Sequence, residues 1–124
     1  MQKISYKAKS EVGQRAYVFG LRILKLCSFL PNKKAIWIIS DQIMRSSMSI
    51  GANIAEAQGA GSRLDFKRYL EIALKSSHET LYWLHMLVDS GLATEKNVGL
   101  LIVEVQEIIR MLSKSVLTLK SNKT

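Results

Sequence analysis

The sequence is poor in the residues that cross-link, interrupt or chemically activate a protein chain. Its 124 residues include one cysteine, one proline and two histidines, and aromatic residues make up 7%. A lone cysteine cannot form an internal disulfide, and Cys27 lies on an apolar helical stripe, which identifies it as a core residue rather than a nucleophile. The composition favours a globular, helical chain.

Long apolar runs are also lacking. No aliphatic or aromatic run is long enough to span a bilayer, and the first residues lack the apolar segment of a secretion signal. A chain of 124 residues has room for one domain, which we place at 1–124. We therefore expect a cytoplasmic, single-domain protein with no membrane partner.

The residue types of active sites do not occur at useful spacings. His78 and His85 are separated by two helical turns, about 10 Å, which is too far for one metal ion. The glycines before Ser62 lack the Gly-Lys-Ser/Thr of a phosphate loop, although a helix starting at Ser62 can still hold a phosphate. No histidine is placed to activate a serine or cysteine. We expect no enzymatic activity, no catalytic residue, no metal and no cofactor.

Apolar residues recur every three or four positions in four stretches of the chain. Ser62 and Thr94 are expected to cap helix starts, whereas Pro31, Gly59 and Gly91 follow helix ends, with Gly59 in the left-handed conformation. Because the connections are short, each helix must turn back beside the preceding one. The predicted fold is all-α, an up-down-up-down antiparallel four-helix bundle with helices at about 10–30, 33–58, 62–90 and 94–121.

The helix at 33–58 carries more apolar surface than one bundle core can cover. More than a quarter turn from its core stripe lies a second stripe, made of Trp37, Met44, Met48, Gly51 and Ala55. Such a stripe packs either on a neighbouring helix of the same chain or on another subunit. We expect an oligomer interface here, and the intramolecular alternative stays open.

Polar residues lie between these two stripes. In a hairpin about the turn at 59–62, residues whose numbers sum to about 121 lie side by side, which places Arg45 near Ser76 and Glu79. The same register places Glu56 near Arg63 and Lys67. We interpret the polar residues as a structural seam that fixes the register of the helices, with a ligand cleft as the alternative. The seam comprises Arg45, Ser49, Asn53, Glu56, Ser76 and Glu79.

Positive charge is the main chemical signal of the sequence. Lys and Arg number 18 against 10 Asp and Glu, so the net charge is +8, which favours acidic partners such as nucleic acid. When each predicted helix is cut at its midpoint, this charge falls in the half that holds both termini and the turn at 59–62. The alternative is a merely solvated surface. The candidate nucleic-acid-binding residues are Lys7, Lys9, Arg15, Arg63, Lys67, Arg68, Lys114 and Lys120. The charge counted for this half also includes Lys123 in the tail.

One stretch carries a family resemblance. The segment 45–66, RSSMSIGANIAEAQGAGSRLDF, followed by YLEIALKSS at 69–77, resembles the signature of the four-helix bundle proteins encoded in 23S rRNA intervening sequences. It is also similar to their relatives, the accessory variability proteins of diversity-generating retroelements. The resemblance covers nearly the whole chain, and Ala55 stands where the retroelement branch often has an arginine. The matching motif positions are Arg45, Ser49, Asn53, Glu56, Gly59, Ser62, Phe66, Ser76 and Glu79.

The resemblance implies homopentameric barrels of four-helix protomers with basic surfaces. Its retroelement branch implies binding of nucleic acid and of a reverse transcriptase. Two functions remain open for this chain: a homo-oligomeric RNA- or DNA-binding accessory protein that uses the basic end, or a scaffold that docks a protein such as a reverse transcriptase without binding nucleic acid.

Overall fold

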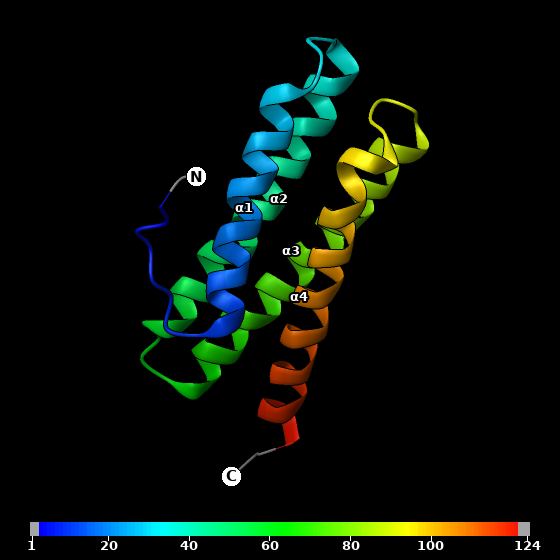
Figure 1. Cartoon of the computed structure of the whole chain (residues 1–124). Helices are drawn as coiled ribbons and strands as arrows, with labels where there is room; N and C mark the ends of the chain where they lie inside the picture. Colours follow the sequence, from blue (N-terminus) through cyan, green and yellow to red (C-terminus); the bar gives the residue numbers. More distant parts are fainter. Residues whose placement is uncertain (1–2, 122–124) are drawn as a thin grey trace.

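A computed structural model describes residues 3–121 and has the predicted four-helix bundle (Figure 1). Each helix begins and ends within one residue of its expected range. Between residues 3 and 121 no strand is present. The helices are α1 (Glu11–Phe29), α2 (Lys34–Gln58), α3 (Arg63–Asp89) and α4 (Glu95–Ser121).

The helix boundaries follow from local side-chain chemistry. The Ser10 hydroxyl accepts a hydrogen bond from the Gly13 amide at 3.1 Å, and the Ser62 hydroxyl accepts one from the Asp65 amide at 3.1 Å, so α1 and α3 are capped by serine. Gly91 has φ +79, the left-handed backbone that favours glycine. The expected left-handed Gly59 is wrong, because its φ is −100 and its amide bonds back to the carbonyl oxygens of the last helical turn.

Each helix packs on two neighbours. The contacts within the described residues join α1 to α2, α2 to α3, α3 to α4 and α4 to α1, so chain order is also the order around the bundle. The start of α1, the turn between α2 and α3 and the end of α4 therefore lie at one end, which is the lower end in Figure 1. The turns between α1 and α2 and between α3 and α4 lie at the other.

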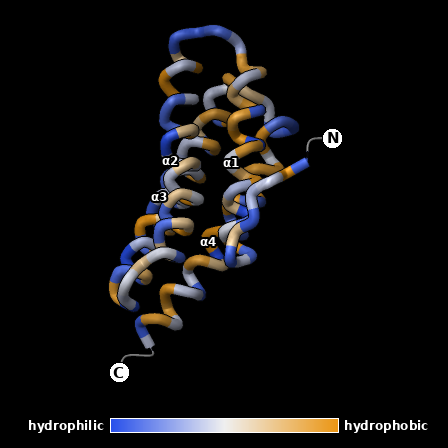
Figure 2. Tube along the Cα trace, turned by 90° about the vertical axis from the view of Figure 1, so that its left-hand side faces the viewer, coloured by the Kyte–Doolittle hydropathy of each residue, from blue (hydrophilic) through white to orange (hydrophobic). Residues whose placement is uncertain are grey.

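Burial of one apolar stripe from every helix forms the core. Its largest fully buried side chains include Phe19, Ile43, Leu84 and Ile108, one from each helix. Hydrophobic and hydrophilic residues alternate along the helical trace, as an amphipathic bundle requires (Figure 2). Full burial of each such side chain stabilises the fold by about 1.5–3 kcal/mol.

The segment before α1 is extended and lies back against the bundle. The Gln14 side chain holds it, because its amide donates to the Tyr6 carbonyl at 3.0 Å and its carbonyl accepts from the Ala8 amide at 2.8 Å. The Tyr6 ring stacks on Tyr17 with 4.4 Å between the ring centroids. These contacts place Lys7 and Lys9 beside the end where α1 begins.

Candidate functional site

The predicted basic residues gather at the end of the bundle where α1 begins. Lys7 and Lys9 precede α1, while Arg63, Lys67 and Arg68 lie in the first two turns of α3. The C-terminal part of α4 reaches the same end, since an Arg63 guanidinium nitrogen lies 3.4 Å from the Leu119 carbonyl oxygen and Lys120 Nζ lies 3.8 Å from the Glu71 carboxylate. Lys123 lies outside the described residues.

Arg15 differs from the other predicted contacts. Its guanidinium donates two hydrogen bonds of 2.9 Å to Glu104 on α4 and lies 3.9 Å from Glu107. The hydrogen bond with Glu104 is the main cause of a raised pKa for Arg15, which burial opposes. Arg15 therefore cross-links α1 to α4, and its expected contact with nucleic acid stays a prediction.

The remaining basic residues differ in whether they form ion pairs with acidic residues of the chain. Arg68 lies 3.7 Å from Asp65, and Lys120 pairs with Glu71, but such exposed pairs contribute at most about 1 kcal/mol. A second group has no ion pair with any described residue and is available to an anionic ligand. This group, which we call the free lysines, comprises Lys7, Lys9, Lys67 and Lys114.

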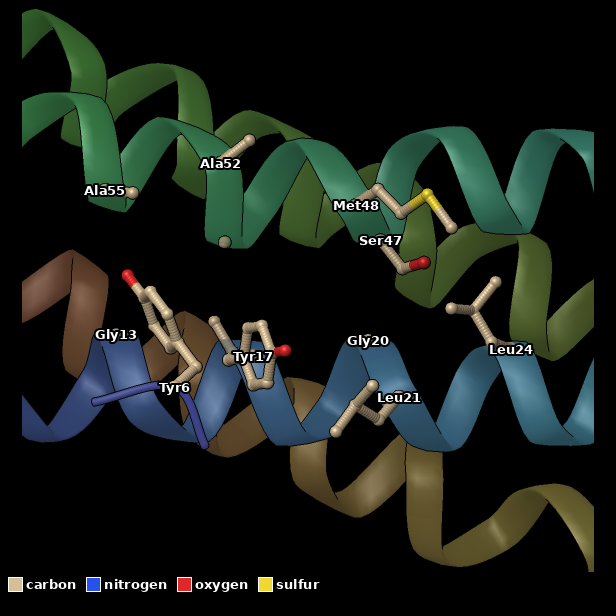
Figure 3. A pocket seen from close by; sticks show the side chains of 12 residues that line it. Tyr6, Gly13, Tyr17, Gly20, Leu21, Leu24, Ser47, Met48, Ala52 and Ala55 are labelled. Carbon is tan, nitrogen blue, oxygen red and sulfur yellow. The ribbon is translucent and has the colours of Figure 1, made fainter. Parts of the chain in front are cut away.

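An apolar groove runs between α1 and α2 (Figure 3). It has a volume of about 420 Å³, and small residues on both helices make it deep, among them Gly20 on α1 and Ala52 on α2. Tyr17 and Met48 stand on its opposite sides and are 36% and 46% exposed. A second hollow of about 480 Å³ shares Leu24 with it and continues to Trp37. Together they form one apolar strip along the α1/α2 face.

The structure divides the predicted interface stripe of α2. Trp37, Met48 and Ala55 are exposed on the α1/α2 face. Gly51 and Met44 also line these hollows, but each contacts its own chain: an added Cβ at Gly51 would lie 3.8 Å from Ala16 of α1, and Met44 packs against the core. For these two residues the interface and the intramolecular alternative both stay open.

The groove contains residues that the sequence analysis missed. Tyr6, Tyr17 and Leu24 supply the α1 side, together with Gly13 and Gly20. The signal was present in the sequence, because positions 13, 17, 20 and 24 follow the same three- and four-residue spacing as a core stripe. A second apolar stripe on α1 was thus readable beside the one on α2.

The seam between α2 and α3 exists, but it is built from hydroxyl groups. The Ser49 and Ser76 hydroxyls lie 2.9 Å apart, and Asn53 donates to the Ser49 hydroxyl at 3.0 Å. Buried Thr80 donates to the Ser46 hydroxyl at 2.8 Å. These three predicted members, Ser49, Asn53 and Ser76, are therefore brought together.

The charged members of the predicted seam lie elsewhere. Arg45 pairs with Asp41 of its own helix at 2.9 Å and forms no ion pair with Glu79 within the described residues. Glu79 accepts a hydrogen bond from the Trp83 indole at 3.1 Å. Glu56 has no ion pair among the residues from 3 to 121, so it is not bonded to Arg63 or Lys67, and their expected proximity stays a prediction. The residue numbers of the observed pairs, Ser49 with Ser76 and Ser46 with Thr80, sum to about four more than the expected 121. Each residue of α2 therefore lies beside a residue of α3 that is about one helical turn further along the chain than expected.

Cys27 lies half-buried beside the hollow near Trp37. Burial raises the pKa of its thiol, which keeps it protonated and poorly nucleophilic. Residues 3–121 contain no group of three or more histidine, cysteine, aspartate and glutamate side chains arranged to hold a metal ion. Over the same residues, no helix is long and apolar enough to cross a membrane.

Comparisons with known proteins point to one family. The family model for the 23S rRNA-intervening sequence protein matches residues 8–114. A similar solved structure is the crystal structure of a protein with unknown function from the S23 ribosomal protein family of Bacteroides thetaiotaomicron, which is 39% identical with a TM-score of 0.80. The match covers 85% of this chain and 97% of that one. No curated protein matches the chain.

Proposed function

The chain belongs to the family of 23S rRNA-intervening sequence proteins, and on this premise we propose that it is a non-enzymatic, homo-oligomeric nucleic-acid-binding protein of the cytoplasm. Its basic end binds the phosphate backbone of RNA or DNA. It serves as an accessory to another nucleic-acid process rather than as a catalyst.

The free lysines carry this proposal. Lys7, Lys9, Lys67 and Lys114 come from three separate segments, yet they lie at one end of the bundle without acidic partners among the described residues. The ion pairs described at this end join Arg68 to Asp65 and Lys120 to Glu71, so the charge of these four lysines stays unpaired. Phosphate groups would neutralise it, with the release of counterions as the driving force.

The α1/α2 face supports a homo-oligomer. Trp37, Tyr17 and Met48 are exposed along this face, and aromatic residues and methionine are enriched at interaction surfaces. The assembly we propose is the homopentamer implied by the family resemblance. Side-by-side assembly would combine the basic ends into one multivalent rim with a higher affinity for nucleic acid than a single protomer.

Two pairs of charge reversals test the proposal. Lys9→Glu with Lys67→Glu alters the basic end, whereas Lys34→Glu with Lys96→Glu makes the same change of charge at the opposite end, where α2 and α4 begin. We expect the first pair to weaken binding of a structured RNA at low salt at least tenfold, as measured by filter binding, and the second pair to have a much smaller effect. Equal weakening by both pairs would show that net charge, and not this end, determines binding.

A second function is favoured by the same groove. The apolar strip on the α1/α2 face would also suit a helix of another protein, such as a reverse transcriptase, and the chain would then be a docking scaffold whose charge serves solubility. The two functions differ in a simple observation. A scaffold of this kind binds its protein partner but shows no affinity for RNA at low salt.

A further inference from the structure

The basic end contains a hollow that is separate from the α1/α2 groove. It opens where the starts of α1 and α3 meet the ends of α2 and α4, and its volume is about 340 Å³. Pockets that hold small organic groups begin at about 300 Å³. The hollow is therefore large enough for one compact ligand group.

The walls of this hollow are apolar. Val12, Phe66 and Leu119 line it and are only half-buried, so they retain apolar surface that a ligand would remove from water. Buried Ile54 and Leu70 lie beneath them. Phe66 is the aromatic residue of the lining and offers a ring on which a flat group can stack.

Polar groups on the lining can recognise an edge of such a ligand. Ser115 donates its hydroxyl proton to the Met111 carbonyl at 3.1 Å, and Thr118 donates to the Lys114 carbonyl at 3.0 Å, so both oxygens keep lone pairs that can accept. The side-chain amide of Gln58 has no hydrogen-bond partner within residues 3–121, so it can both donate and accept a hydrogen bond. The lining thus offers donors and acceptors between apolar walls.

Positive charge surrounds the hollow. Lys114 lines it and has no ion pair with a described residue, and Lys9 directly precedes Ser10, another lining residue. The Arg63 guanidinium lies against the carbonyl of Leu119. An anionic group attached to the ligand would meet these cations at the rim.

We propose that this hollow binds one unpaired nucleobase of a single-stranded or bulged nucleic acid, with the adjoining phosphate on Lys114. The inference rests on the proposed function and adds the class of nucleic acid to it. A flat ring with hydrogen-bonding edges and an attached phosphate matches the apolar walls, the polar groups and the cationic rim together. A base inside a duplex cannot enter, because its faces are covered by its neighbours.

The first test uses small ligands and nuclear magnetic resonance of the isotope-labelled protein. We expect nucleoside 5′-monophosphates to shift the Gln58 side-chain and Ser115 backbone signals, and ribose 5-phosphate, which carries the phosphate without the base, to leave them nearly unchanged. Equal shifts with both ligands would reduce the hollow to a phosphate site and overturn the proposal. Stronger shifts with decanoate than with the nucleotides would assign it to an acyl chain instead.

The second test compares a single-stranded RNA with a blunt-ended RNA duplex, which has no unpaired base, of the same total number of nucleotides at the same salt concentration. We expect the single strand to bind about tenfold more tightly, which is the usual scale of one stacked base. Ser115→Leu fills the hollow without changing charge and should remove this preference, whereas Gln106→Leu, an exposed control on α4, should retain it. Circular dichroism confirms that both variants fold.

The outcomes separate the two proposals. Equal binding of both RNAs, with no effect of Ser115→Leu, would overturn the base site and leave the basic-end function standing. Absence of binding to both RNAs at low salt would overturn the proposed function, and the nucleotide shifts alone would then decide the base site.

Discussion

Alanine substitutions at two glycines of α1 give a quantitative test of the described packing. A Cβ added at Gly20 meets no atom within 4 Å, because this glycine opens onto the α1/α2 groove. A Cβ at Gly13 would lie 3.0 Å from the Ser10 hydroxyl oxygen and 3.2 Å from a methyl carbon of Ile54. Both glycines lie in the same helix and are changed to the same residue, so only their surroundings differ.

The expected changes in stability have opposite signs. Alanine is favoured over glycine inside a helix by about 0.8–1.0 kcal/mol, so Gly20→Ala should raise the free energy of unfolding by about that amount and the melting temperature by about 4 °C. At Gly13 the added methyl would displace the capping serine, whose bond contributes about 1 kcal/mol, and press on the core. We expect Gly13→Ala to lower stability.

Urea unfolding followed by circular dichroism measures both changes. The measurement is made at a protein concentration at which light scattering gives the same mass for each variant, since assembly adds to apparent stability. Gly20→Phe serves as a third variant, because its ring would occupy the groove and should reduce the oligomeric mass while the protomer stays folded. Equal effects of Gly13→Ala and Gly20→Ala, or a Gly20→Phe variant that assembles normally, would refute this account of the groove.

Three further predictions address assembly, pH and the seam. Met48→Glu should lower the mass in light scattering without loss of helical circular dichroism, because Met48 is 46% exposed on the α1/α2 face, and an unchanged mass would contradict the interface. The hydrogen bond from Arg110 lowers the pKa of Glu107 in the folded protein. The ionised Glu107 carboxylate therefore stabilises the fold above the ordinary carboxyl pKa, and this stabilisation is lost as pH falls through the lowered pKa of the folded state. Urea unfolding from pH 7 to pH 3 should therefore show a weaker loss of stability in Glu107→Gln, and identical pH profiles would exclude this effect. Thr80→Val removes hydroxyl contacts of 2.8 Å to Ser46 and to the Ser76 carbonyl, and should cost about 1–3 kcal/mol in thermal unfolding, whereas no change would mean that the seam hydroxyls contribute nothing.

The helices were predictable because their signals are local. Apolar spacing along each stretch sets the buried face, and Ser10 and Ser62 start helices in the structure as serine caps do generally. Gly91, which follows α3, has the left-handed backbone that its position suggests. The order of the helices around the bundle then follows from their short connections.

The register between helices was not predictable from spacing alone. A hairpin register depends on how many residues the turn consumes, and a shift of four in the sum moved Ser76 from Arg45 to Ser49. The same limit affected Arg15. Cutting each predicted helix at its midpoint placed Glu104 and Glu107 at the other end, whereas α4 in fact extends past the start of α1 and brings both carboxylates to Arg15.

The basic end was found from charge, but its internal ion pairs were not. Net charge counts a paired arginine and a free lysine alike, although Arg15 binds Glu104 and Lys67 has no ion pair with a described residue. The hollow beside Phe66 was also invisible in the sequence, because it is formed by the ends of all four helices. Such a shape depends on the angles between helices, which the apolar pattern does not set.

The salt dependence of RNA binding is the most direct test of the central claim. Titrations of the wild-type protein with a structured RNA, from about 50 to 200 mM salt, give the slope of log affinity against log salt concentration. If the free lysines of one protomer contact phosphates, affinity should fall steeply over this range, and the slope should be shallower for Lys9→Glu with Lys67→Glu. Absence of binding at the lowest salt, or an affinity that does not change with salt, would contradict a phosphate-binding basic end.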